Sequence, residues 1–319
     1  MVETAAAGGN PFRKFLVSFA VLAVAGCAAD LDPADSVDPR VLVVGATMTR
    51  EQCRDPATSV WMVVDGQGEC MRYFHAGLAD RNPLVHVWFH GDRQIHMKNG
   101  ERRALAYHDN APAKLRAQAE AEFRARGIPF IRLSRPGVYG SSGDHSQRRR
   151  PRDIAVIDAA LTAIKAKYRI ERFALSGQSG GGHVVASLLT LRHDVGCAVI
   201  TSGVVAVRER NRIKGWSRDV TGHDDFFDPI DHVREIPLDG RRIFIVADPE
   251  DALVPFAIQV GYRVALAQAG HDARLIRARG TDRNRHSLAA TGHKVVKWCV
   301  DGWPAEKIVE QATSPGLGG

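Results

Sequence analysis

The chain has 319 residues, of which 45% are hydrophobic and 25% charged, with 30 glycines and 15 prolines. This composition is typical of globular proteins and excludes a wholly disordered, collagen-like or coiled-coil chain. The formal charge is +7, but the basic residues are spread along the chain without interleaved aromatic residues, so no nucleic-acid partner is expected. The length favours one domain with an inserted segment over two domains.

The N-terminus has the pattern of a secretory signal. A basic pair precedes an apolar run at 15–25, which is too short to span a bilayer and fits the core of a signal peptide. The run leads to Cys27 through Val-Ala-Gly, which resembles the bacterial lipobox, in which residues 1–26 are removed and the cysteine is lipidated. Because Ala28 replaces the aspartate that retains such lipoproteins in the inner membrane, the resemblance implies an outer-membrane lipoprotein facing the periplasm. An ordinary signal cleaved near residue 25 is the alternative.

Four further cysteines support an oxidising compartment, because an even number is typical of disulfide-bonded secreted proteins. They allow three pairings. Cys53 with Cys70 would join two neighbouring predicted strands and would leave Cys197 for Cys299. Free buried thiols are the alternative.

The mature chain begins with a polar, proline-containing segment at 27–39, which predicts a tether to the lipid anchor. The domain is predicted over 40–310. It opens with short β-branched or aromatic segments separated by turn residues, which predict antiparallel strands at 40–47, 61–65 and 71–76.

From residue 84 onward, strands alternate with helices, which predicts an α/β fold with a mostly parallel sheet covered on both faces. The predicted strands are 84–89, 130–133, 173–175, 198–201, 243–247 and 273–278. The predicted helices are 112–126, 153–168, one after Ser179, one after Pro255 and one near 292–300.

Local signals mark the ends of these elements. Gly127 is expected to end the first helix in a left-handed conformation, and Asp153 is expected to be the N-cap of the second. The segment at about 202–241 has no clear strand and is predicted to be a small cap over the sheet. Residues 311–319 are small and polar and predict a disordered tail.

The clearest chemical motif is Gly-x-Ser-x-Gly between a predicted strand and a predicted helix, which is the context of a nucleophile elbow. Gly177 and Gly181 leave room for a sharp turn that lifts the Ser179 hydroxyl above the sheet. The following helix points its first amides toward developing negative charge. A glycine-rich phosphate loop is the alternative, but neither of its usual patterns is present.

A serine nucleophile needs a base, which a third group must orient. Asp251 follows the predicted strand at 243–247, and His286 follows the one at 273–278. The order Ser179, Asp251, His286 resembles the α/β-hydrolase superfamily. The pattern Asp-x-x-Val-Pro that starts at Asp251 is similar to the acid loop of these enzymes, so the resemblance implies that Asp251 is the acid and His286 the base.

Neighbouring residues are alternatives for the same two roles. Asp248 and Glu250 lie in the acid loop. His293 is expected on the final helix, and His183 directly follows the elbow, where a packing role is favoured.

An oxyanion hole requires two backbone donors directed at the carbonyl oxygen. One is expected at Gly180, the residue after the nucleophile. The strand at 84–89 leads into His90-Gly91-Asp92, which is similar to the His-Gly turn of these enzymes and implies a second donor at Asp92 or Gly91. Many relatives have a second glycine where this chain has Asp92.

Three other segments have weaker signals. The glycine-rich loop at 135–144 is expected either to line the site or to be an ordinary turn. The basic run at 148–152 is expected to be solvated, and the carboxylates near 224–228 lack histidines at ligand spacing, so no metal is predicted.

The resemblance covers about 40–300, and Asp-Pro-Ile-Asp-His-Val at 228–233 is similar to prolyl-oligopeptidase-type serine peptidases and related esterases. It implies a serine hydrolase without a cofactor that acts on a small ester. A peptidase or amidase acting on peptides is the alternative, and so is a non-catalytic, lipid-anchored envelope protein with a decayed site.

Overall fold

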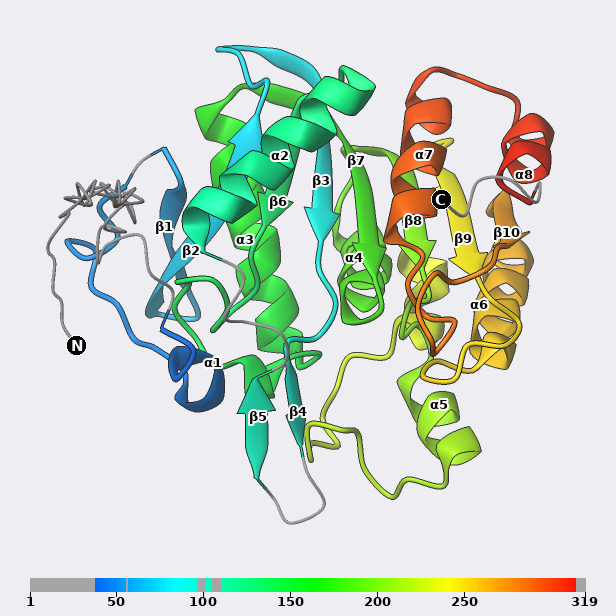
Figure 1. Ribbon diagram of the computed structural model, residues 1–319, viewed down its shortest axis with the longest axis horizontal. Helices are drawn as coiled ribbons and strands as arrows, with labels where there is room; N and C mark the ends of the chain where they lie inside the picture. Colours follow the sequence, from blue (N-terminus) through cyan, green and yellow to red (C-terminus); the bar gives the residue numbers. More distant parts are fainter. Residues whose placement is uncertain (1–37, 56, 97–100, 105–110, 314–319) are drawn as a thin grey trace, which may run out of the picture.

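The computed structural model describes residues 38–55, 57–96, 101–104 and 111–313. Its centre is an eight-stranded sheet (Figure 1). The strand order is β1 (Ser59–Val64), β2 (Gln67–Ala76), β6 (Phe130–Leu133), β3 (Asn82–Phe89), β7 (Ile170–Gln178), β8 (Val195–Thr201), β9 (Arg242–Ala247) and β10 (Ala273–Arg277).

The sheet is mixed, as the sequence predicts. β2 is antiparallel to both β1 and β6, and every neighbouring pair from β6 to β10 is parallel. The carboxyl ends of the parallel strands therefore meet at one edge, which is where the polar loops of such a sheet form a site.

Helices cover both faces of the sheet (Figure 1). One face carries α3 (Pro151–Lys167), α4 (Gly180–Leu191) and α6 (Phe256–Gln268). The other carries α2 (Pro112–Arg126), α7 (Ala289–Val300) and α8 (Ala305–Thr313). The central strands are buried on both faces, so their apolar side chains follow one another without alternation.

The predicted strand at 40–47 is wrong. The chain there forms the short helix α1 (Val41–Val44), because its backbone bonds are local: the amide of Val44 donates to the carbonyl of Arg40 at 3.0 Å. Gly45, at φ 81°, then turns the chain away, and only Ala46 makes an isolated β-bridge, to Gly143.

The predicted helix ends are partly correct. Gly127 ends α2 in the left-handed conformation at φ 66°. Asp153 is not the N-cap of α3, which begins at Pro151, because proline needs no backbone partner in the first turn of a helix. α8 runs to Thr313, three residues past the predicted end of the domain at 310.

The segment at 202–241 contains α5 (Val207–Lys214) and the short 3₁₀ helix η3 (Pro229–Glu235), and no strand. In Figure 1, α5 lies beyond the carboxyl ends of the central strands. The hairpin β4 (Gln94–His96) and β5 (Arg102–Ala104), which the sequence pattern did not indicate, lies at the same edge.

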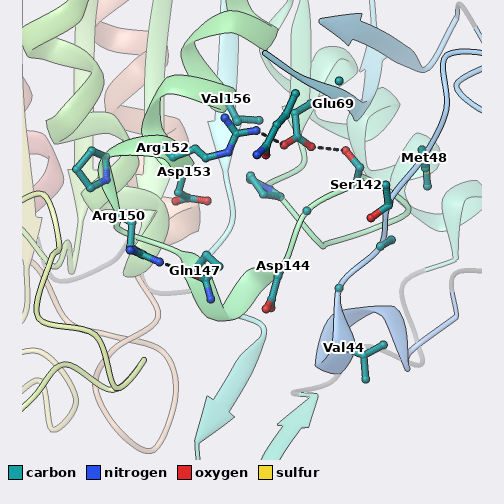
Figure 2. A pocket seen from close by; sticks show the side chains of 18 of the residues that line it. Val44, Met48, Glu69, Ser142, Asp144, Gln147, Arg150, Arg152, Asp153 and Val156 are labelled. Atoms are coloured by element: carbon teal, nitrogen blue, oxygen red, sulfur yellow. Dashed lines mark hydrogen bonds and ion pairs between the residues drawn. The ribbon is translucent and has the colours of Figure 1, made fainter. Parts of the chain in front are cut away.

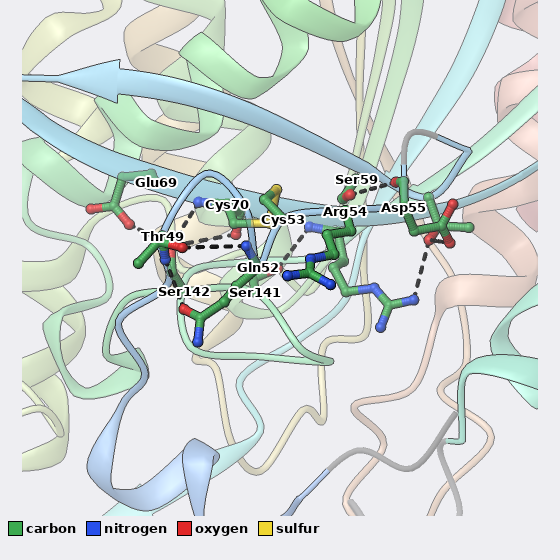
Figure 3. The surroundings of a disulfide bond; sticks show 12 residues. Thr49, Gln52, Cys53, Arg54, Asp55, Ser59, Glu69, Cys70, Ser141 and Ser142 are labelled. Carbon is green, nitrogen blue, oxygen red and sulfur yellow. Dashed lines mark hydrogen bonds between the residues drawn. A yellow bond between two sulfur atoms is a disulfide. The ribbon is translucent and has the colours of Figure 1, made fainter. Parts of the chain in front are cut away.

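Two disulfides join the four cysteines of the domain. Cys53 is bonded to Cys70 of β2 (Figure 3), and Cys197 of β8 is bonded to Cys299 of α7. The first attaches the segment before β1 to the sheet, and the second attaches the C-terminal helices to its centre.

The predicted signal peptide and Cys27 lie outside the described residues. Within the part of the chain that the structure describes, no helix combines the length and the apolar character needed to cross a bilayer.

Candidate active site

The predicted nucleophile elbow is a sharp turn where β7 passes into α4. Ser179 has φ 57° and ψ −117°, a region that residues other than glycine rarely adopt and that costs about 1–3 kcal/mol. A Cβ at Gly177 would lie 2.2 Å from the carbonyl oxygen of Gly181, and one at Gly181 would lie 2.1 Å from that of Phe89. Only glycine fits at these two positions, which confirms that the turn needs a residue without a side chain on each side of Ser179.

Asp251 and His286 are in contact. His286 Nδ1 lies 2.8 Å from Asp251 Oδ2, and the aspartate carboxylate is 2% exposed. The other oxygen of Asp251 accepts the amides of Leu253 and Val254 at 2.8 and 2.9 Å. The loop after β9 therefore holds the carboxylate in a fixed orientation toward the imidazole.

The loop that carries His286 is attached to the strand ends beside the serine. The carbonyl of His286 accepts Gln178 Nε2 at 2.7 Å and Ser202 Oγ at 2.9 Å. Gln178 directly precedes Ser179, so this bond brings the histidine loop to the elbow. Among the described residues, the hydrogen bonds of His286 do not include one to Ser179 Oγ. Catalytic hydrogen bonds often close only when substrate is bound.

The two other carboxylates of the acid loop have different partners. Asp248 is fully buried and accepts Gly280 N and Arg285 Nε, both at 2.7 Å. Burial favours its neutral form, but the bonds from Arg285 and from backbone amides outweigh burial and lower its pKa. Glu250 has a side chain that is 73% exposed and lies 3.5 Å from Arg285. Asp248 thus fixes the start of the histidine loop, and Glu250 points to solvent.

The alternative histidines lie in packed positions. His293 sits on α7 with its Nδ1 3.0 Å from Glu122, and its ring packs against Trp88. His183 is buried, its Nε2 lies 2.8 Å from the carbonyl of Phe227, and burial lowers its pKa to about 3. Neither is in hydrogen-bond contact with Asp251.

The loop after β3 lies against the elbow. A Cβ at Gly91 would be 3.3 Å from Ser179 Cβ and 4.0 Å from its Oγ. A Cβ at Gly180 would be only 1.9 Å from Asp92 Oδ1. Gly91 therefore lies against Ser179, and the carboxylate of Asp92 lies against Gly180, the residue after the serine.

Asp92 is surrounded by arginines. Its carboxylate contacts Arg135 Nη1 at 2.9 Å, Arg148 Nε at 3.0 Å and Arg149 Nη2. Burial alone would raise the pKa of Asp92, but the guanidinium groups of Arg149, Arg148 and Arg135 hold it well below its ordinary value. The carboxylate beside the elbow is thus neutralised by its neighbours.

The prediction that the run at 148–152 is solvated is wrong for its first two members. Arg148 and Arg149 are each 1% exposed. Arg149 also reaches Asp219 of the segment at 202–241, at 3.1 Å. The network therefore connects the loop after β3 to that segment, and the loop at 135–144 contributes Arg135 to it.

Comparison with known proteins shows similarity at the level of structure. No family model and no curated protein matches the chain. The esterase Pf2001 of Pyrococcus furiosus matches with a TM-score of 0.56 and 12% identity over 84% of this chain and 99% of that one. Est1E of Butyrivibrio proteoclasticus, solved with ferulic acid, matches with a TM-score of 0.53 and 15% identity over 80% and 100%.

The acylaminoacyl peptidase of Pyrococcus horikoshii matches with a TM-score of 0.56 and 16% identity, over 79% of this chain and 43% of the peptidase. The chain thus spans less than half the length of that protein. The fold follows from the mixed, mostly parallel sheet together with these structural matches. The chain has the α/β-hydrolase fold.

Within this α/β-hydrolase fold, three residues of the site could not be predicted from the sequence: Gln178, Arg148 and Arg149. Gln178 occupies a variable position of Gly-x-Ser-x-Gly, and only its place next to the serine could have indicated a role. Arg148 and Arg149 belong to a basic run whose carboxylate partners lie far away in sequence, so no local pattern predicts their burial.

Asp92→Asn is expected to lower the free energy of unfolding by about 3–5 kcal/mol, because it leaves three buried guanidinium groups without their shared carboxylate. The folded-state pKa of Asp92 is depressed, so its contribution is complete above about pH 4 and is lost as the pH falls through that folded value. Urea unfolding at several pH values measures both effects. Equal stability of Asp92→Asn and wild type at pH 7 would contradict this assignment.

Proposed function

We propose that the protein is a serine hydrolase that cleaves carboxylic esters through an acyl-enzyme intermediate. The observation that carries the proposal is the 2.8 Å contact between His286 and Asp251, on a loop bonded to the residue before Ser179. The strained backbone of Ser179 adds support, because strain of this kind gathers at functional sites.

In the proposed reaction, Ser179 Oγ attacks the ester carbonyl while His286 Nε2 accepts its proton. Asp251 fixes the imidazole tautomer through Nδ1 and stabilises the imidazolium that forms. The histidine then protonates the leaving alcohol. Water, activated by the same histidine, releases the acid and restores the serine.

The tetrahedral oxygen of the intermediate is held by the amide of Gly180 and by a second amide from the loop after β3, at Gly91 or Asp92. The arginines around Asp92 keep the nearby carboxylate from opposing the developing negative charge, which matters because charges act strongly in a dry site.

A peptidase or amidase is the second candidate, because an acylaminoacyl peptidase and a puromycin hydrolase share the fold. Esters are favoured because this chain matches almost the whole length of the two esterases, whereas it matches only 43% of the length of the peptidase. The test compares 4-nitrophenyl acetate and butyrate with aminoacyl 4-nitroanilides. We expect kcat/KM to be higher for the esters; faster cleavage of the anilides would favour the peptidase, and no cleavage of either would favour a decayed site.

We further propose that Cys27 carries a lipid that anchors the protein to the bacterial envelope, since its motif resembles the lipobox. Cys27→Ala is expected to move the protein from the membrane fraction to the soluble fraction, because each buried CH₂ of an acyl chain contributes about 0.8 kcal/mol. Esterase activity per molecule should not change. Fractionation followed by immunoblotting measures this, and unchanged membrane association would support an ordinary signal instead.

A further inference from the structure

A cavity lies at the β1–β2 edge of the sheet. It has a volume of about 960 Å³ and is lined by the segment at 44–48, by β1 and β2, by the segment at 136–150 with the start of α3, and by Asp225 (Figure 2). Its lining contains none of Ser179, Asp251 and His286. We call it the edge groove.

The charged side chains of the edge groove are mostly satisfied by one another. They are Glu69, Asp144, Asp153, Asp225, Arg150 and Arg152, which is two more carboxylates than guanidinium groups. Arg152 Nη2 donates to Glu69 at 2.7 Å, and Arg150 Nε donates to Asp225 at 2.8 Å. Asp144 accepts the amide and the hydroxyl of Ser146 at 2.8 and 2.7 Å, and it lies 3.6 Å from Arg102 Nη1.

Asp153 is the exception. It is 5% exposed, and its Oδ2 accepts only the amide of Arg149, at 3.1 Å. Its Oδ1 is buried without a hydrogen-bond partner, and Figure 2 shows the carboxylate facing the groove between Arg150 and Arg152. A buried carboxylate oxygen without a partner is costly, so a ligand that donates to it would gain that free energy.

Apolar and aromatic groups complete the wall. Trp61 packs on Gly68, where a Cβ would lie 2.2 Å from the indole ring, and both residues line the groove. Met48 and Val156 line it as well. An aromatic ring in the same wall as a carboxylate oxygen without a hydrogen-bond partner suits a cation on an apolar body. Ca²⁺ and Mg²⁺ require several oxygen ligands, and no cluster of three or more metal-binding side chains occurs among the described residues.

We infer that the edge groove binds an organic cation, a primary amine or guanidinium carried on an apolar body, with the charged group on Asp153 and the body against Trp61. The cation donates a charge-assisted hydrogen bond to Asp153 Oδ1. This binding does not require the hydrolase activity.

The test uses 2-phenylethylamine as the probe and 2-phenylethanol as its uncharged counterpart, with calorimetric titration of the full chain. We expect the wild type to bind the amine about tenfold more tightly than the alcohol. We expect Asp153→Asn to bind both with similar Kd, and Asp153→Glu, which keeps the charge, to restore part of the preference. Asp301→Asn is the matched control, because it makes the same change on an exposed residue outside the groove and should keep the full preference.

Equal affinity of the wild type for the two probes would overturn the inference, whether or not Asp153→Asn folds. An unchanged amine preference in a folded Asp153→Asn would also overturn it, because the cation would then bind elsewhere. Circular dichroism of each variant establishes that it is folded.

Discussion

Ser179→Ala is expected to lower kcat for 4-nitrophenyl butyrate by about 10⁴-fold or more, with the fold retained. The hydroxyl is the attacking group in the proposed mechanism, and only binding and the oxyanion hole would remain. Initial rates with purified protein measure the change, and circular dichroism shows whether the fold is retained.

His286→Ala should cause a loss of similar size, and the double variant should be no worse than either single variant, because members of a triad act as one unit. His293→Ala is the control for the base, since His293 packs against Trp88 instead of lying beside Asp251. Near-native activity of His286→Ala together with an inactive, folded His293→Ala would show that the base is assigned wrongly.

Asp251→Asn is expected to reduce turnover by about 10⁴-fold, because asparagine at this position selects the wrong imidazole tautomer. The side chain keeps its shape, and its contacts with Leu253 N and Val254 N can remain. The fold should therefore persist, and the loss should appear in kcat.

The matched control is Asp248→Asn, three residues earlier in the same loop. Asp248 bonds to Gly280 and Arg285, so its replacement should mainly lower stability. Kinetics and thermal unfolding of both variants separate the two roles. A well-folded, fully active Asp251→Asn would move the acid to Asp248 or Glu250.

The sequence predicted the parts of the fold that depend on local patterns. The alternation of strand and helix from β3 to α7 follows from hydrophobic periodicity and capping residues, as at Gly127. The elbow was predictable because its two essential glycines lie within two residues of Ser179.

Features that depend on distant contacts were not predictable. The segment at 40–47 has β-branched residues, but its local hydrogen bonds produce α1 instead of a strand. Arg149 is buried because it pairs with Asp92 and Asp219. These partners lie 57 and 70 positions away in the sequence, so no pattern in the basic run reveals them.

Labelling with a fluorophosphonate probe tests the central proposal most directly, because such a probe reacts far faster with a serine that its surroundings activate than with an ordinary hydroxyl. Wild-type protein is treated with the probe and digested, and the modified peptide is identified by mass spectrometry. The proposed mechanism predicts one stoichiometric modification, on Ser179, that is absent in Ser179→Ala and strongly slowed in His286→Ala. An unlabelled wild type, or labelling that persists in Ser179→Ala, would contradict it.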